Sequence, residues 1–242
     1  MKGVDRRLVV SLDARLRSLV RWLLWTGGIA ALLAGALLSL RLDHHFSGVL
    51  FTAAVHLPVL GWCAEQLSAI GNPLPGTALT GALVLAAACG RRLVSAVALA
   101  SIPLAASWSC SVLKVLIERS RPDYSCERSV PCLVAGYSMP SGHAVGATVL
   151  YGLIATLALL YLRRPAWWCA GITLAVGIGI SWSRVVVGAH YAADVLAGQV
   201  LGTAWVLLGV LVLSCDAHRV PRRSPTTREE SASTTKQRSQ ER

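Results

Sequence analysis

Long apolar runs separated by short polar segments dominate this chain. Six of them are long enough, or nearly so, to cross the hydrocarbon core of a bilayer as helices that rise about 1.5 Å per residue. The runs cover residues 22–40, 73–90, 93–117, 144–162, 166–182 and 191–215. The pattern predicts an all-α fold, a polytopic membrane bundle with six transmembrane helices.

The segment between the first and second runs has a different character. Residues 43–72 mix polar and apolar positions and are interrupted by Pro58. Such a segment is typical of helices that lie in the membrane interface, so we expect one or two interfacial helices here. A metal site is the alternative, because the segment contains His44, His45 and His56. Their spacing is poor and no carboxylate lies one turn from a pair, so we predict no metal site.

The two ends of the chain differ from the apolar centre. Residues 1–21 are rich in Lys and Arg and are expected to form a basic cytoplasmic segment. Residues 22–215 form the expected membrane domain, and residues 216–242, rich in Ser, Thr, Arg and Glu, are expected to be a disordered cytoplasmic tail. The first apolar run is interpreted as a retained signal anchor. A cleaved signal peptide is the alternative, because Ala34-Gly35-Ala36 resembles a small-residue cleavage site.

Composition and charge agree with a membrane protein. Hydrophobic residues make up 54% of the chain, charged residues only 14%, and the mean hydropathy is +0.57, which is unusual for a soluble domain. The net charge of +11 would suggest a nucleic-acid partner in a soluble protein. Most of the basic residues, however, fall in the two ends and in the Arg-Arg hinges at 91–92 and 163–164. The positive-inside rule therefore places both termini in the cytoplasm, with the chain in the cytoplasmic (inner) membrane, and no nucleic-acid partner is expected.

The cysteines indicate one candidate disulfide. Of seven cysteines, only Cys126 and Cys132 share a polar loop, and that loop lies on the expected extracytoplasmic side. A disulfide between them is therefore our expectation, with two free thiols as the alternative. The cysteines lack the CxxC or Cys/His spacing of a zinc site.

A small-residue pair marks the last apolar run. Gly198 and Gly202 are four residues apart, a spacing that allows two helix backbones to approach closely. We expect this contact inside the bundle, and a helix-mediated dimer is the alternative.

Three polar clusters interrupt the apolar sequence, and the topology places all of them on the extracytoplasmic side. The first, KVLIERSRP, contains Lys114 and Arg121, which are seven residues apart and would project from one face of a helix that ends at Pro122. Two cations directed at one point suit a dianionic ligand. A structural pair between Lys114 and Glu118, one turn further along, is the alternative.

The second and third clusters supply groups for anion binding and acid–base chemistry. Ser141 and Gly142 stand at an expected helix start, where unpaired backbone N–H groups attract anions. His143 follows, and on its own could be an ordinary interfacial histidine. In the third cluster, His190 and Asp194 have the i, i+4 spacing that places both on one face of a helix, where the carboxylate can accept the imidazole N–H and hold one tautomer.

Together the three clusters resemble the type 2 phosphatidic acid phosphatase superfamily. The matching motifs are Lys-x6-Arg-Pro at 114–122, Pro-Ser-Gly-His at 140–143 and Ser-Arg-x5-His-x3-Asp at 183–194. The resemblance implies that His190 is the nucleophile, that Asp194 orients it and that His143 is the general acid. It also implies a phosphate cradle of Lys114, Arg121, Ser141, Gly142 and Arg184.

The resemblance implies a lipid phosphatase that works without a metal or another cofactor. Its substrate would be a membrane lipid phosphate or diphosphate: polyprenyl (undecaprenyl) diphosphate, phosphatidylglycerol phosphate or phosphatidic acid. The alternatives are a phosphotransferase acting on lipid A, or a membrane transporter with buried ionisable residues. The related vanadate-dependent haloperoxidases share the cradle but are soluble, which the apolar runs argue against.

Overall fold

The computed structural model describes residues 6–39, 42–123, 136–162 and 166–219, and the secondary structure of these ranges is helical. The helices are α1 (Arg6–Ser39), α2 (Asp43–His56), α3 (Pro58–Ile70), α4 (Pro73–Cys89), α5 (Leu93–Ile117), α6 (Gly142–Tyr161), α7 (Ala166–Val186) and α8 (Ala192–Arg219). The prediction of an all-α fold is confirmed.

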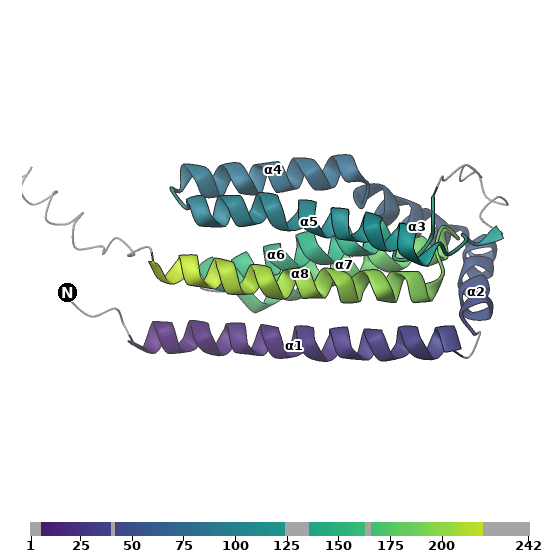
Figure 1. The fold of residues 1–242 in the computed structure, drawn as a ribbon, viewed down its shortest axis with the longest axis horizontal. Helices are drawn as coiled ribbons and strands as arrows, with labels where there is room; N and C mark the ends of the chain where they lie inside the picture. Colours follow the sequence, from purple (N-terminus) through teal and green to yellow (C-terminus); the bar gives the residue numbers. More distant parts are fainter. Residues whose placement is uncertain (1–5, 40–41, 124–135, 163–165, 220–242) are drawn as a thin grey trace, which may run out of the picture.

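Most of the helices run side by side along the long axis of the molecule (Figure 1). Within the described residues, five helices contain segments long and apolar enough to cross a membrane, namely Ala14–Ala36, Leu93–Ile117, Gly142–Tyr161, Ala166–Val186 and Ala192–Ala217. α4 is also apolar but, with 17 residues, shorter. It runs beside α5 (Figure 1), and a sixth span arises among the described helices only if the bent pair of α2 and α3 is counted as one. The molecule is therefore a multi-pass membrane protein.

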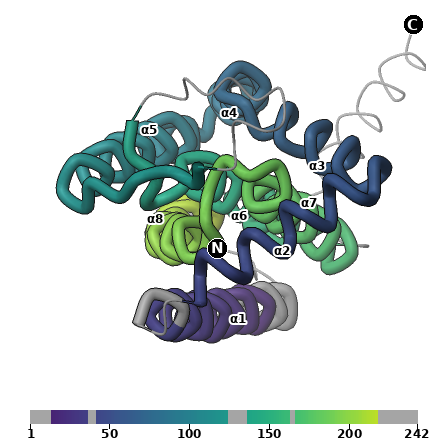
Figure 2. The backbone as a smooth tube through the Cα atoms, turned by 90° about the vertical axis from the view of Figure 1, so that its right-hand side faces the viewer, coloured from purple at the N-terminus to yellow at the C-terminus, as the bar shows by residue number. Residues whose placement is uncertain are grey.

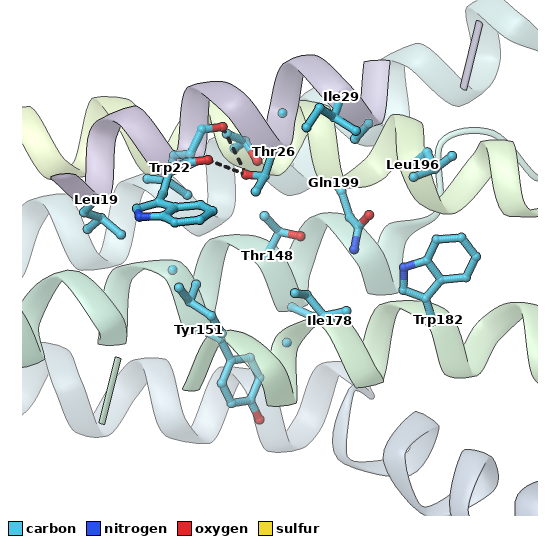
Figure 3. A pocket seen from close by; sticks show the side chains of 18 of the residues that line it. Leu19, Trp22, Thr26, Ile29, Thr148, Tyr151, Ile178, Trp182, Leu196 and Gln199 are labelled. Carbon is cyan, nitrogen blue, oxygen red and sulfur yellow. Dashed lines mark hydrogen bonds between the residues drawn. The ribbon is translucent and has the colours of Figure 1, made fainter. Parts of the chain in front are cut away.

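α2 and α3 close one end of the bundle. The two helices meet at an angle of 112°. The break falls before Pro58, which is at the start of α3, because a proline lacks the N–H that a continuing helix would need. α2 lies across the ends of α7 and α8 and leads from α1 to α3 (Figure 2). This arrangement agrees with the expectation of two helices in place of a clean span.

α6 is the central helix. It contacts α1, α4, α5, α7 and α8. In its most apolar stretch 67% of the residues are buried, compared with 22–44% in the corresponding stretches of the other four spans. Its side chains Val145, Val149 and Leu153 belong to the main apolar core, together with residues of α1, α5 and α8. The start of α6 is thus held firmly by its neighbours.

Glycines of α8 allow that helix to lie directly against α6. A Cβ atom added at Gly198 would meet the carbonyl oxygen of Ser141 at 2.7 Å and Cβ of Ala144 at 2.8 Å. At Gly202 it would meet Cβ of Thr148 at 2.7 Å. These contacts support the expectation that the pair serves packing within the bundle.

The ends of the helices differ from the expected boundaries. α1 begins at Arg6, so most of the basic segment and the first apolar run form a single helix. α8 continues past Cys215 to Arg219, and Asp216 is buried where its carboxylate accepts a hydrogen bond from Ser95. The rest of the expected tail, residues 220–242, lies outside the described residues. α1 starts and α8 finishes at the same end of the bundle, opposite α2 (Figure 1).

The Gly198 contact leads to a stability prediction. Gly198→Ala should destabilise the protein by about 1–3 kcal/mol, because the added methyl group has no room beside Ser141 and Ala144. Gly146→Ala is the matched control, since a Cβ atom at Gly146 on α6 would meet nothing within 4 Å. Thermal unfolding of the detergent-solubilised variants would measure the difference. Equal midpoints for the two variants would contradict the close contact.

Candidate active site

The three polar clusters meet at the end of the bundle that α2 crosses. They come from the last turn of α5 and residues 118–123, from residues 136–141 and the first turn of α6, and from the end of α7, the turn that follows it and the first turn of α8. The two parts of the first loop are joined where the Ser138 N–H donates to the carbonyl oxygen of Arg119 (2.8 Å). The Ser141 N–H donates to the carbonyl oxygen of Asp194 (2.9 Å), which ties the start of α6 to α8.

His190 lies in the turn before α8, because that helix begins only at Ala192. The prediction that His190 and Asp194 share a helical face is therefore wrong in its geometry. The contact itself is present, with 3.6 Å between Nδ1 of His190 and Oδ2 of Asp194. Gly188, with φ of 80°, makes the turn, a conformation that other residues rarely adopt. The N–H groups of Ala189 and His190 then both donate to the carbonyl oxygen of Arg184.

Ser138 connects the imidazole to the carboxylate. Its hydroxyl group donates to Oδ2 of Asp194 and lies 3.2 Å from Nδ1 of His190. A hydroxyl group has one proton, so Ser138 must accept from Nδ1–H of the histidine. This hydrogen-bond pattern assigns the neutral tautomer with the proton on Nδ1 and a lone pair on Nε2.

The lone pair of His190 faces a cation. Nη1 of Arg121 lies 3.4 Å from Nε2 and also donates to the carbonyl oxygen of Ala189 (3.0 Å). Guanidinium groups only donate, which agrees with the tautomer assigned above. Nε2 of His190 and the guanidinium group of Arg121 therefore face the same space.

Lys114 and Arg121 converge for a different reason from the predicted one. α5 ends at Ile117, and Glu118 follows in a left-handed conformation with φ of 51°, so Arg121 lies beyond the helix. The prediction that the two cations share one helical face, with Pro122 ending the helix, is wrong. Both instead bind the segment before α6: Nζ of Lys114 donates to the carbonyl oxygens of Tyr137 (2.6 Å) and Ser138 (3.2 Å), and Nε of Arg121 donates to that of Gly136 (3.1 Å).

The alternative of a Lys114–Glu118 pair finds no support. Glu118 accepts a hydrogen bond from the hydroxyl group of Tyr137 instead (3.1 Å).

The start of α6 offers unused hydrogen-bond donors. α6 begins at Gly142 after Ser141, as predicted, and no side chain caps its first turn. Oγ of Ser141 and Nε of Arg184 are both buried, and neither has a hydrogen-bond partner among the described residues. Buried polar groups are rarely left unpaired unless a ligand or water completes them. The first amides of a helix also attract anions, so these donors form a site for a negatively charged group.

His143 completes the cluster. Its charge would interact with those of Arg184, His190, Arg121 and Lys114, which places the predicted site residues in one region. Nε2 of His143 lies 3.2 Å from Oδ1 of Asn72, in the connection between α3 and α4. Arg184 donates to the hydroxyl group of Ser68 on α3.

Several residues at the site were missed in the sequence interpretation. Ser138, Asn72 and Ser68 stand in no recognisable spacing, and they reach the site only through the fold. Arg119 stands inside the first cluster, yet its role becomes visible only in the structure: it forms ion pairs with both Asp194 and Asp43, each at 2.7 Å. The sequence signal available for Asp43 was a single acidic residue beside a run of apolar ones.

Two further expectations are not settled by this geometry. Cys126 and Cys132 lie outside the described residues. Within the described residues, no group of three or more His, Cys, Asp or Glu side chains is arranged to hold a metal ion, and this includes His44, His45 and His56. Metal independence remains a prediction for experiment.

The molecule is thus a multi-pass helical membrane protein in which a His–Asp pair, converging cations and the first amides of α6 form a candidate oxyanion site at one end. A family model described as the PAP2 superfamily matches residues 77–215. The chain belongs to the PAP2 superfamily.

Curated relatives match parts of the chain. It is 38% identical over 112 residues to phosphatidylglycerophosphatase B of Bacillus subtilis, 34% identical over 110 residues to a lipid A 1-phosphatase of Rhizobium johnstonii, and 44% identical over 72 residues to an undecaprenyl-diphosphatase of Sulfolobus acidocaldarius. The matches cover 43%, 43% and 29% of this chain and 50%, 42% and 30% of the respective relatives. The chain thus matches half or less of the length of each.

One solved structure has the same fold. The crystal structure of a transmembrane PAP2 type phosphatidylglycerolphosphate phosphatase from Bacillus subtilis aligns with a TM-score of 0.66, at 22% identity, over 84% of this chain and 98% of that one. At this identity the likeness establishes the fold.

The environment of His190 leads to a titration prediction. Burial is the main cause that lowers the pKa of His190 to about 4, and Arg121 and Arg184 lower it further, while Asp194 acts in the opposite direction. His190 should therefore stay neutral as the pH falls through 6.5, where an exposed histidine gains its proton. Because the unfolded chain binds that proton first, this histidine should reduce stability as the pH falls from 6.5 towards 4.

NMR titration of labelled histidine would test this, with His190→Gln used for assignment. A His190 resonance that titrates near 6.5 would contradict the assigned environment.

Proposed function

We propose that this protein is a phosphatase that hydrolyses a lipid phosphate or diphosphate at the extracytoplasmic membrane face through a phosphohistidine intermediate. The observation that carries the proposal is the pair of buried donors without partners, Oγ of Ser141 and Nε of Arg184, beside a neutral histidine. Phosphoryl transfer requires such fixed donors and cations, because charge spreads over the phosphoryl oxygens in the transition state.

The cradle would bind the phosphoryl group before any bond changes. Ser141 and the backbone amide of Gly142 supply donors at the start of α6, Arg184 supplies a donor from the end of α7, and Arg121 and Lys114 supply further cations. Lys114 uses two of its three N–H donors on carbonyl oxygens, which leaves one for the ligand. These groups would neutralise the phosphate and hold the phosphorus in line with Nε2 of His190.

Two chemical steps follow from this placement. In the first, the lone pair on Nε2 attacks phosphorus, a P–N bond forms, and the bond to the leaving oxygen breaks as His143 donates a proton to that oxygen. His190 becomes a cation in this step, and Asp194, through Ser138, would stabilise it at Nδ1. In the second, His143 takes a proton from water, the water oxygen attacks phosphorus and the P–N bond breaks.

The substrate class follows from the position of the cradle. The site lies at one end of an apolar bundle, so a lipid could keep its chain in the bilayer while its head group reaches His190. The Arg-rich start of α1 and the end of α8 lie at the opposite end of the bundle from the site (Figure 1), which with the positive-inside rule supports an extracytoplasmic site in the cytoplasmic membrane. The names of the relatives support polyprenyl diphosphate, phosphatidylglycerol phosphate and lipid A phosphates as candidates, and the family resemblance adds phosphatidic acid.

A phosphate-release assay with purified protein would test the function. The panel would contain undecaprenyl diphosphate, phosphatidylglycerol phosphate, phosphatidic acid and lipid A, each without an added acceptor. Free phosphate from at least one lipid is the expected result and would separate hydrolysis from transfer to a second lipid. Absence of phosphate release throughout the panel would contradict the proposal. If the protein were instead a transporter, it would neither release phosphate nor form a phosphoenzyme.

Removal of the nucleophile should abolish turnover. His190→Ala removes the nitrogen that attacks phosphorus, so we expect no phosphohistidine and a loss of activity of about 10⁴-fold or more. The control is His56→Ala, because His56 is an exposed histidine at the end of α2. The phosphoenzyme would be trapped with a radiolabelled substrate at alkaline pH, where phosphohistidine survives. A labelled phosphoenzyme in the His190→Ala variant would contradict the assignment.

Chelation should leave activity intact. Lys114, Arg121 and Arg184 supply the positive charge that Mg²⁺ provides in many phosphoryl-transfer enzymes. Full turnover in excess EDTA is therefore expected, measured as phosphate release after dialysis against the chelator. Loss of activity that added Mg²⁺ or Zn²⁺ restores would overturn this prediction.

A further inference from the structure

Two buried polar residues of α2 point at the start of α8. Asp43 and Ser47 are one helical turn apart and only 2% and 0% exposed, although neighbouring positions of α2 are largely exposed. Burial of a carboxylate is costly unless its oxygens are fully partnered. The partners of Asp43 therefore indicate what α2 does at this end of the bundle.

The first set of partners is the backbone of α8. The N–H of Ala192 donates to Oγ of Ser47 (2.9 Å), and the N–H of Ala193 donates to Oδ1 of Asp43 (3.0 Å). The first amides of a helix have no partner within that helix, and a side chain close by in sequence usually caps them. Here the cap comes from residues 145 and 150 positions earlier in the chain. α2 thus fixes where α8 begins, two residues after His190 and two before Asp194.

The second partner of Asp43 is Arg119, which also binds Asp194. Nη2 of Arg119 donates to Oδ2 of Asp43 and Nη1 donates to Oδ1 of Asp194, both at 2.7 Å. The guanidinium group also lies over the ring of Tyr191, with 4.4 Å from Cζ to the centroid. The two Nη groups of Arg119 thus bind two different carboxylates.

Because Arg119 binds only Oδ1 of Asp194, the other carboxylate oxygen, Oδ2, is available to groups around His190. Oδ2 accepts from the hydroxyl group of Ser138 and from the N–H of Tyr191 (2.9 Å), and through Ser138 it reaches His190. Arginine prefers to bind a carboxylate with two parallel N–H groups. Without Asp43, Arg119 would be free to turn both N–H groups towards Asp194 and to compete with Ser138 for Oδ2.

We propose that Asp43 and Ser47 are positioning residues, which hold the start of α8 and the carboxylate of Asp194 so that His190 is correctly oriented. This inference rests on the proposed function of His190 and Asp194. Under this proposal α2 helps to orient His190. If α2 had a purely structural role, it would only hold the helices together.

The test compares Asp43→Asn with Asp216→Asn in the full-length protein. Asp216 is the matched control, because it is also a buried aspartate bonded to a serine but lies at the opposite end of α8. Asp43→Asn should lower kcat about 10- to 100-fold with little change in KM, since small displacements of reacting groups have effects of that size. Asp216→Asn should leave kcat unchanged in the folded fraction. An unchanged kcat in Asp43→Asn, or an equal loss in both variants, would overturn the proposal.

A second measurement needs no substrate. The Nδ1 proton of His190, bonded to Ser138, should give a low-field ¹H NMR signal that is absent from His190→Gln. That signal should shift or disappear in Asp43→Asn and persist in Asp216→Asn; its persistence in Asp43→Asn would overturn the proposal. If the unmodified protein releases no phosphate, the proposed function fails, while this signal still decides whether Asp43 positions His190.

A milder variant covers the case in which Asp43→Asn does not fold. Ser47→Ala keeps the ion pairs and removes one cap hydrogen bond, worth about 1 kcal/mol, so kcat should fall a few-fold with retained folding. Arg119 is left unchanged in this test, because it also forms the ion pair with the buried Asp194. A wild-type kcat in folded Ser47→Ala would contradict a positioning role for the cap.

Discussion

The buried carboxylate of Asp194 is the interaction on which this end of the molecule depends. An ionised group with no exposure to solvent is tolerated only if its oxygens are partnered, and Asp194 has Arg119 on one oxygen and Ser138 with the Tyr191 amide on the other. Its backbone carbonyl oxygen receives the Ser141 N–H as well. These partners come from three separate segments, so satisfying one charge brings together His190, the start of α6 and the cations.

Close helix packing makes that convergence possible. α8 can carry Asp194 up to the start of α6 because Gly198 leaves no side chain between the two helices. The loops then need to span only short distances, and their carbonyl oxygens orient Lys114 and Arg121. The membrane-spanning part thus supplies a rigid frame, and irregular backbone at its end supplies the ligand-binding groups, as is common where function is grafted onto a fold.

Much of this was readable from the sequence, and the failures have physical causes. Apolar runs predicted the membrane-spanning helices, because a helix must have a certain length to cross a bilayer. Motif spacing predicted which polar residues meet at one end of the bundle. The end of α5 at Ile117 was missed, because the residue in left-handed conformation that ends the helix is Glu118 and not the glycine that usually marks such a position in a sequence. Asp43 and Ser138 were missed because their roles arise from contacts 150 and 56 residues apart in sequence, which no local periodicity encodes.

The pairing of Asp43 with Arg119 also has a consequence for biosynthesis. Both residues are made well before Asp194, so a growing chain already contains a counter-charge for Arg119 when α5 enters the membrane. α8, which carries Asp194, is translated after the other seven described helices. When α8 is added, Asp194 becomes the second carboxylate beside Arg119, which already has Asp43 as its counter-charge. Only then are all the charges of the site present. A chain that stops before α8 would hold a paired Arg119 but no assembled site.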